Sequence, residues 1–129
     1  MSLADYFENV KGYGVLATAD GTGRVNVAVY ARPHVVDETT VAFIMAERRT
    51  HENLQGNPWA AYSFLETGEG WSGKRLYLQK IREEQNEDLL REICRRCDYS
   101  RYDVSHRHIV FFSVEKVLPL IGVGSGPAD

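Results

Sequence analysis

The chain has 129 residues, 43% of them hydrophobic, and this length and composition predict one globular domain with a core of its own. Its 15 basic and 18 acidic residues give a net charge of -3, which argues against nucleic acid as a partner, and no apolar run is long enough to span a membrane. The first residues lack the basic start and apolar stretch of a signal peptide, and two cysteines do not suggest a disulfide framework, so we expect a cytoplasmic protein.

The first part of the sequence predicts a short helix followed by closely spaced strands. Gly12 and Gly14 end an amphipathic helix expected over residues 4–11. A strand over residues 14–20 and a glycine-containing hairpin turn precede the clearest strand, over residues 24–32. That strand alternates, so two sets of side chains face opposite sides of a sheet: Val25, Val27 and Val29 against Asn26, Ala28 and Tyr30.

The rest of the chain predicts further strands and one long helix. Pro33 cannot donate to a strand ladder, so the chain bends or lies at an edge there and continues extended over residues 34–36. Strands are expected over residues 39–45, 59–65, 74–81 and 108–118, and the main helix over residues 84–97. Residues 1–121 would form the domain, and residues 122–129 a flexible tail.

This order of elements indicates the fold class. About six strands, hairpin-linked early and accompanied by few helices, predict a mainly β protein: a six-stranded antiparallel barrel, closed or partly closed. A parallel βαβ fold needs a crossover helix between successive strands, and these strands follow one another too closely for that.

Residues 43–58 combine the features of an anion-binding site. An apolar strand leads into Arg48 and Arg49, and a short helical pattern then stops at Asn57-Pro58. Thr50 is expected to cap that helix, because its hydroxyl can accept from the free amides of the first turn. Free amides, the helix dipole and two arginine forks favour a phosphate monoester. The equally simple alternative is a pair of solvated arginines beside a turn.

Together with the order of elements, four segments resemble the FMN-binding split β-barrel proteins, the pyridoxamine 5'-phosphate oxidase-like superfamily. The segments are Val15-Leu-Ala-Thr-Ala-Asp20, Gly23-Arg-Val-Asn-Val-Ala-Val-Tyr30, Val41-Ala-Phe-Ile-Met45 and Arg48-Arg-Thr-His-Glu-Asn-Leu-Gln-Gly-Asn-Pro58. The resemblance implies an FMN-binding oxidoreductase or redox protein that acts on a small-molecule substrate or electron donor. It also implies a homodimer with FMN at the subunit interface.

The resemblance further implies which residues hold the cofactor. The FMN phosphate would lie on Arg48, Arg49 and Thr50, with Asn53 in support. The flavin ring would lie against two strands, on Asn26, Val27, Ala28, Tyr30, Phe43, Ile44 and Met45. The second subunit would contribute Trp71, Lys74 and Arg75. A sheet face of small and β-branched residues suits a flat, largely apolar ring, with Tyr30 or Trp71 available for stacking.

Two observations limit the resemblance. Pyridoxamine phosphate oxidases carry a longer C-terminal region that binds substrate and flavin, whereas the last expected strand here ends near Leu118, so we do not expect vitamin B6 oxidase activity. Arg32 and His34 follow the proposed flavin strand directly. They are either ligands of an anionic substrate or of the flavin's polar edge, or solvated side chains at a bend.

The remaining cysteines and histidines suggest weaker alternatives. Cys94 and Cys97 have redox-motif spacing, but they fall at the end of the expected helix, where the dipole disfavours a thiolate, so buried structural cysteines are expected. His106 and His108 share a strand face, which leaves haem or another small ligand, bound without turnover, as the alternative function. No acidic or cysteine partner follows at a fixed offset, so no metal site is expected. A cofactor-free dimeric interaction module is a third possibility.

Overall fold

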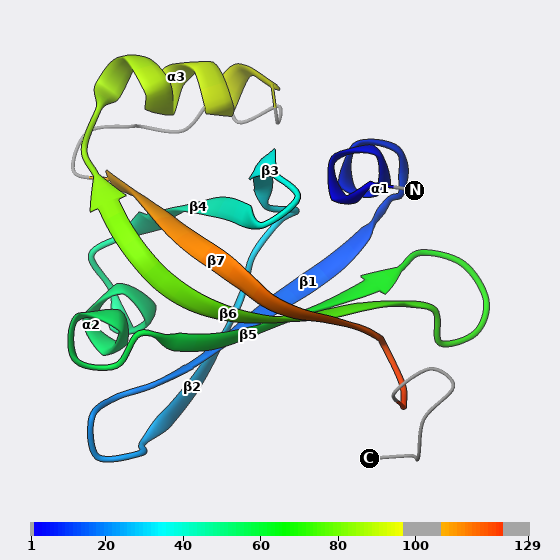
Figure 1. The fold of residues 1–129 in the computed structure, drawn as a ribbon, viewed down its shortest axis with the longest axis horizontal. Coiled ribbons are helices and arrows are strands. Elements are labelled where there is room, and N and C mark those ends of the chain that lie inside the picture. The colour runs from blue at the N-terminus through cyan, green and yellow to red at the C-terminus, as the bar shows by residue number, and fades with distance from the viewer. Residues whose placement is uncertain (1, 97–106, 123–129) are drawn as a thin grey trace.

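The structure, a computed structural model, describes residues 2–96 and 107–122 (Figure 1). Strands dominate it, and the helices are short. The elements in chain order are α1 (Leu3–Asn9), β1 (Gly12–Ala19), β2 (Val25–Val29), β3 (His34–Asp37), β4 (Thr40–Ala46), α2 (Arg49–Gly56), β5 (Trp59–Glu66), β6 (Gly73–Glu84), α3 (Glu87–Arg96) and β7 (Arg107–Pro119).

The strands form one antiparallel sheet in the order β2-β1-β5-β6-β7-β4-β3. The mainly β, antiparallel architecture expected from the sequence is confirmed. The described residues hold seven strands rather than six, because residues 34–37, expected only as an extended continuation, pair with β4 and become an edge strand.

The sheet encloses one apolar core, and the alternation within each strand decides which side chains enter it. In β1, for example, Leu16 is fully buried, while Tyr13 and Val15 on the other face are exposed. Helices α1 and α2 add Phe7 and Leu54 to the same core. Helix α3 covers the opposite side of β4 and β7, where a second cluster packs: Ala42, Leu90, Ile93, Ile109 and Phe111.

The main helix begins later than the sequence pattern predicted. Strand β6 continues to Glu84, which pairs with Ile109 of β7, so the helix cannot begin at residue 84. It begins instead at Glu87, and the amide of Leu89 donates to Asn86 Oδ1 at 3.1 Å, which caps the first turn. The ladder with β7 therefore overrides the helical propensity of the first acidic residues.

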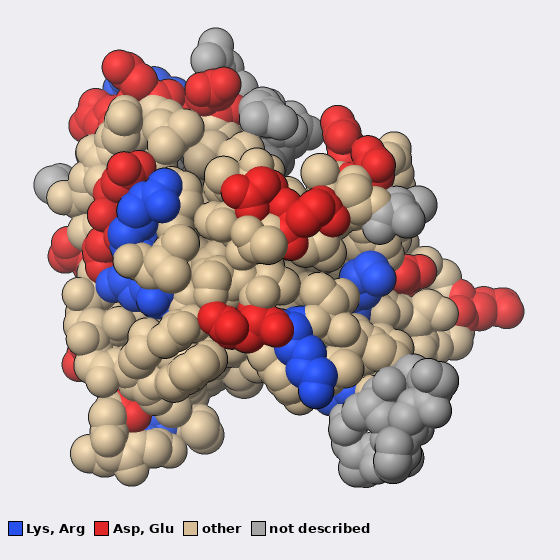
Figure 2. All heavy atoms as spheres, in the orientation of Figure 1, with Lys and Arg blue, Asp and Glu red and all other residues tan. Residues whose placement is uncertain are grey.

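None of the described helices is long and apolar enough to cross a membrane. On the face drawn in Figure 2, acidic and basic side chains of the described residues are interspersed. Residue Cys97 and all of the expected tail except Gly122 lie outside the described residues, and nothing is described of the Cys94 side chain. The domain boundary and the role of the cysteine pair therefore stay predictions.

Tyr6 gives the fold a testable dependence on alkaline pH. Its hydroxyl donates to Glu66 Oε2 at 2.6 Å, and the side chain is 6% exposed. Burial, and then the hydrogen bond to the Glu66 carboxylate, raise the pKa of Tyr6 well above its ordinary value. A tyrosine whose pKa is higher in the folded than in the unfolded state stabilises the folded protein as long as it is protonated in both. This contribution is complete below the unfolded-state pKa of about 10 and is lost as the pH rises further.

We therefore expect Tyr6→Phe to lower the free energy of unfolding at pH 7 by about 1.5–3 kcal/mol, the usual contribution of a hydrogen bond to a charged group. Between pH 9 and about 11 the difference between wild type and variant should shrink, because only the wild type loses the Tyr6 contribution. Urea denaturation at pH 7 and between pH 9 and about 11 measures the difference in unfolding free energy and its change with pH. A difference that stays constant with pH would show that Tyr6 does not titrate with unfolding.

Candidate functional site

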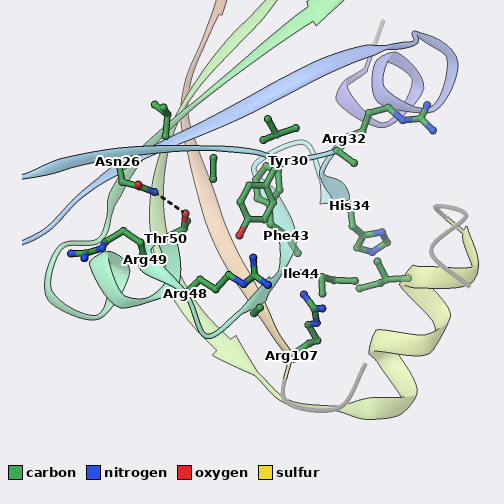
Figure 3. Close-up of a pocket in the computed structure, with 17 residues that line it drawn as sticks. Asn26, Tyr30, Arg32, His34, Phe43, Ile44, Arg48, Arg49, Thr50 and Arg107 are labelled. Carbon is green, nitrogen blue, oxygen red and sulfur yellow. Dashed lines mark hydrogen bonds between the residues drawn. The ribbon is translucent and has the colours of Figure 1, made fainter. Parts of the chain in front are cut away.

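A cavity of about 430 Å³ lies between the two edges of the sheet (Figure 3). Edge strand β2 forms one wall, β3 and β4 from the opposite edge form another, and the start of α2 bounds one end. Both edges reach the same cavity because the sheet curls without pairing β2 to β3. A volume of this order is typical of small-molecule sites.

Most of the site residues predicted from the sequence line this cavity. They come from β2 and the residues after it, from β4, and from the junction between β4 and α2: Asn26, Val27, Ala28, Tyr30, Arg32, His34, Phe43, Ile44, Arg48, Arg49 and Thr50. The fold thus brings together segments that the sequence only suggested separately.

The junction between β4 and α2 forms a positive corner of the cavity. Helix α2 begins at Arg49, and Arg48 precedes it in extended backbone conformation with no side-chain cap bond. The prediction that Thr50 caps this helix is wrong, because Thr50 is already inside it; it is 4% exposed and accepts from Asn26 Nδ2 at 3.4 Å (Figure 3). The first-turn amides are consequently not occupied by a capping side chain, as an anion site requires.

Three arginines line this end of the cavity: Arg48, Arg49 and Arg107 of β7. In Figure 3 the side chains of Arg48 and Arg107 extend toward each other, whereas Arg49 extends away from them. Arginine stays charged at all ordinary pH values and offers a planar fork of donors. The corner therefore combines permanent positive charge with the positive end of the α2 dipole.

The wall beyond this corner is apolar and aromatic. Phe43 is 3% exposed, and its ring meets Tyr30 edge to face, with centroids 5.7 Å apart and planes at 82°. Ala28, Ala42 and Ile44 complete this part of the lining. A flat apolar ring would find van der Waals contact here without having to displace buried polar groups.

Arg32 and His34 line the end of the cavity away from α2 (Figure 3). The guanidinium of Arg32 donates through Nη1 to the carbonyl oxygens of Phe7, at 2.7 Å, and Glu8, at 3.3 Å. It therefore binds the last carbonyls of α1, an arrangement that also suits the helix dipole. A substrate-binding role for either residue stays a prediction.

Two predicted cofactor residues lie outside the cavity lining and serve the scaffold. Met45 is fully buried in the core. Asn53 is 2% exposed and donates from Nδ2 to Thr18 Oγ1 at 3.1 Å. Asn53 thus ties α2 to β1 and, with the Asn26–Thr50 contact, fixes where the helix begins.

The residues expected from a second subunit also lie outside this cavity. Trp71 is 73% exposed before β6. Lys74 Nζ lies 4.7 Å from the centre of the Tyr6 ring, and Arg75 Nε donates to the carbonyl of Pro119 at 3.0 Å. Their contact with a cofactor bound in a partner subunit stays a prediction.

The cavity also contains residues that sequence reasoning missed: Val29, Ala31, Ala42, Ala46, Ile93 and Arg107. Residues two apart in a strand share a face, so Val29 could have been inferred from Val27 in β2, and Ala42 and Ala46 from Ile44 in β4. Ile93 and Arg107 had no such signal, because they come from α3 and β7, far along the chain.

Of the two histidines considered as haem ligands, His106 lies outside the described residues. His108 is 8% exposed, and each of its ring nitrogens lies 3.0 Å from a carboxylate oxygen. His108 does not line the cavity, where a haem would need room, so the described residues give no support to His108 as a haem ligand.

The side of β2, β1 and β5 that faces away from the core is apolar. It exposes large side chains that the strand register places on one surface, which we call the outer face: Tyr13, Val15, Val25, Val27, Val29 and Trp59. Ala17 lies opposite both Val27 and Ala61, which joins the three strands into one continuous surface. Contiguous apolar surfaces of this kind usually mark an interaction site.

Comparison with solved structures relates this geometry to known proteins. An FMN-binding protein from Syntrophomonas wolfei superposes with a TM-score of 0.77 at 20% identity, covering 92% of this chain and 84% of that one. An F420 reductase gives 0.70 at 17% identity, covering 88% and 94%. A candidate pyridoxamine 5'-phosphate oxidase from Lactobacillus delbrueckii gives 0.67 at 15% identity, covering 90% and 89%.

The chain has the split-barrel fold of the pyridoxamine 5'-phosphate oxidase-like proteins. The split is the place where β2 and β3 remain unpaired with each other, and the cavity lies there. No protein-family model matches the sequence, and no curated protein is significantly similar to it. At these identities the similarity establishes the fold of this split barrel; its ligand has to be argued from the site.

Proposed function

We propose that this split barrel binds FMN in the cavity and acts as an FMN-dependent oxidoreductase or redox protein. The observation that carries the proposal is the continuity of a positive strand-to-helix corner with an apolar, aromatic wall. FMN has the matching parts, a phosphate monoester and a flat ring system. The FMN-binding protein from Syntrophomonas wolfei, which shares the fold, supports the choice of ligand.

The residues present fit this cofactor in distinct roles. Arg48, Arg49 and the uncapped amides at the start of α2 would hold the phosphate. Tyr30 and Phe43 would support the ring and exclude water from the surface they cover. Bound FMN supplies hydride or electron transfer, so the protein needs no nucleophile of its own and contributes orientation and access.

We further propose that two chains pair through the outer face. Its exposed valines and aromatic residues would be buried in a homodimer, which removes apolar surface from water. Strand β2 borders both the outer face and the cavity, so a partner bound there would reach the cavity rim. The expected contribution of Trp71, Lys74 and Arg75 from the second subunit is part of this proposal.

The dimer proposal predicts that Val15→Asp abolishes pairing. Val15 is 40% exposed on the outer face and does not line the cavity, so an aspartate there would bring two carboxylates into an apolar interface. Val36→Asp, at a position 46% exposed on β3, is the matched control. Light scattering after size exclusion should show a monomer for Val15→Asp and a dimer for wild type and control. A monomeric wild type would refute the interface.

The cofactor itself is tested on purified protein. Absorbance bands near about 370 and 450 nm would show copurified flavin, whose spectrum belongs to the cofactor. Titration of FMN into flavin-free protein should saturate at one molecule per chain, more tightly than riboflavin, FAD or F420. Uptake of no flavin at all contradicts the proposal and leaves a cofactor-free module. Tighter binding of F420 would replace FMN by a deazaflavin, a choice relevant because an F420 reductase shares this fold.

A further inference from the structure

A half-buried cluster of two histidines and a glutamate lies beside the cavity without lining it. His51 comes from α2, Glu83 from β6 and His108 from β7. His51 Nε2 lies 2.8 Å from Glu83 Oε2, and His108 Nδ1 lies 3.0 Å from the same oxygen. The two imidazole rings stack with centroids 4.2 Å apart and planes at 17°. Three potential metal ligands thus converge on one point from three elements.

Lys80 and Gln55 contact the cluster, and Gln55 Nε2 lies 3.2 Å from His51 Nε2. The side chains of His51, Glu83 and His108 are 13%, 23% and 10% exposed. The second carboxylate oxygen of Glu83 accepts from Lys80 Nζ at 2.5 Å and from Gln55 Nε2 at 3.0 Å. Glu83 thus has contacts with His51 on one oxygen and with Lys80 and Gln55 on the other.

His108 lies between two carboxylates. Its Nδ1 faces Glu83 Oε2 and its Nε2 faces Glu47 Oε1, both at 3.0 Å. A neutral imidazole has one N–H and one bare nitrogen, so one of these contacts would set a lone pair against a carboxylate oxygen. A metal ion bound at Nδ1 would remove that mismatch, since Nε2 then carries the N–H that faces Glu47. The His108 side chain is 10% exposed and that of Glu83 23%, whereas the Glu47 side chain is 66% exposed, so the contact with Glu83 is the enclosed one.

We propose that His51 Nε2, His108 Nδ1 and Glu83 Oε2 bind one divalent transition-metal ion, with Zn²⁺ as the best match. Imidazole and carboxylate are the ligand types that Zn²⁺ accepts, and its tetrahedral sites place ligand atoms about 3–3.5 Å apart. One ligand atom from each residue lies within 4.8 Å of the others. The two stacked rings have to turn out of their nearly parallel planes before both lone pairs point at one ion. Water fills the fourth position.

The contacts outside the three ligands match those of a metal centre. With Zn²⁺ on Nδ1, His108 carries its proton on Nε2 and donates it to Glu47, the carboxylate–histidine–metal arrangement that orients such ligands. Lys80 and Gln55 hold the free oxygen of Glu83 and so fix the direction of the bound one. The ion would join α2 to β6 and β7, one residue along the chain from Thr50 and Arg107, which line the cavity.

The test uses tag-free, full-length protein in which Cys94 and Cys97 are replaced by serine, because thiolates compete for Zn²⁺. After EDTA treatment and dialysis, calorimetric titration with Zn²⁺ should give one ion per chain. His51→Gln and His108→Gln should each weaken binding by about 100-fold or more, and Glu47→Gln by about tenfold. His34→Gln, a histidine variant outside the cluster, should bind as the parent does. No flavin is needed for any of these measurements.

Cobalt provides an independent readout on the parent protein. Co²⁺ should give the intense visible absorption of a tetrahedral site, and stoichiometric Zn²⁺ should remove it. This readout, with Glu47→Gln, keeps the test decisive even where a ligand variant fails to fold. Zn²⁺ binding that is equally tight in His51→Gln and His108→Gln would overturn the proposal. So would a parent that binds no Zn²⁺.

Discussion

Replacing Arg48 and Arg49 together by alanine is expected to weaken FMN binding by about 100-fold or more, while riboflavin affinity changes little. Both residues line the positive corner at the start of α2. A hydrogen bond to a charged group contributes about 1.5–3 kcal/mol, and each 1.4 kcal/mol is a factor of ten in affinity, so two lost contacts account for this size of effect. Riboflavin has no phosphate and so cannot use the corner.

Single substitutions should show how much of the loss in FMN affinity is due to each arginine. Arg48→Ala should cost more than Arg49→Ala, because the Arg48 side chain extends over the cavity toward Arg107, whereas Arg49 extends away (Figure 3). Arg48→Lys should recover only part of the loss, since lysine keeps the charge but not the fork of donors. Arg91→Ala is the control, because Arg91 lies on α3, 62% exposed, and pairs with Glu87.

Fluorescence titration with FMN and riboflavin in parallel measures these affinities. Equal losses for the two ligands would mean that the arginines support the fold or the ring, and not the phosphate. An unchanged FMN affinity in the double variant would place the phosphate elsewhere and remove the main argument for the site.

Gly14→Ala is expected to lower the free energy of unfolding by about 3 kcal/mol, the upper part of the usual range for overpacking. A Cβ at Gly14 would lie 2.0 Å from the hydroxyl oxygen of Tyr62 and 2.3 Å from its Cζ. Tyr62 has no exposed surface, and its ring packs among Phe7, Phe43 and Phe64. The ring therefore cannot move aside without disturbing the centre of the core.

Gly14→Ala should also lower the affinity of the cavity for FMN. Tyr62 Oη donates to the carbonyl oxygens of Tyr30 and Ala31, each at 3.1 Å, and so positions the segment between β2 and β3. Displacing the hydroxyl would release that segment, so FMN affinity should fall along with stability. Tyr62→Phe separates the two effects, because it removes the hydrogen bonds but leaves the core volume nearly unchanged.

Gly21→Ala is the matched control for Gly14→Ala. A Cβ at Gly21 would meet its nearest neighbour, the carbonyl oxygen of Gly56, at 3.9 Å, which is ordinary contact. Its effect should stay within about 0.5 kcal/mol, as for most surface substitutions. Urea denaturation measures the free energy of unfolding of both variants. A similar decrease for the two would show that the core accommodates a Cβ at Gly14 with little strain.

The features that could be predicted from the sequence are those set by neighbouring residues. Alternation in residues 24–32, the β-branched, apolar run over residues 39–45 and the closely spaced turns predicted antiparallel strands, which the structure confirms. The succession of strand, arginine pair and short helix placed Arg48 and Arg49 at a helix start, where the structure has them. Each of these signals spans only a few residues and depends on local backbone geometry.

Other features depended on contacts between distant segments. The start of α3 at Glu87 follows from the β6–β7 ladder, which no local propensity in residues 84–86 reveals. The cavity acquires Arg107 because β7 pairs with β4, and Thr50 accepts from Asn26 of β2 instead of capping its own helix. The cluster of His51, Glu83 and His108 has no fixed spacing along the chain.

The amino-acid sequence by itself thus determined the antiparallel β architecture and the positive corner, because periodicity and helix-start chemistry act over a few residues. Only the tertiary structure decided which side chains meet across the unpaired edges β2 and β3, and which histidines share a carboxylate. Such meetings depend on how far the sheet curls, and that curl is the sum of packing over the whole core.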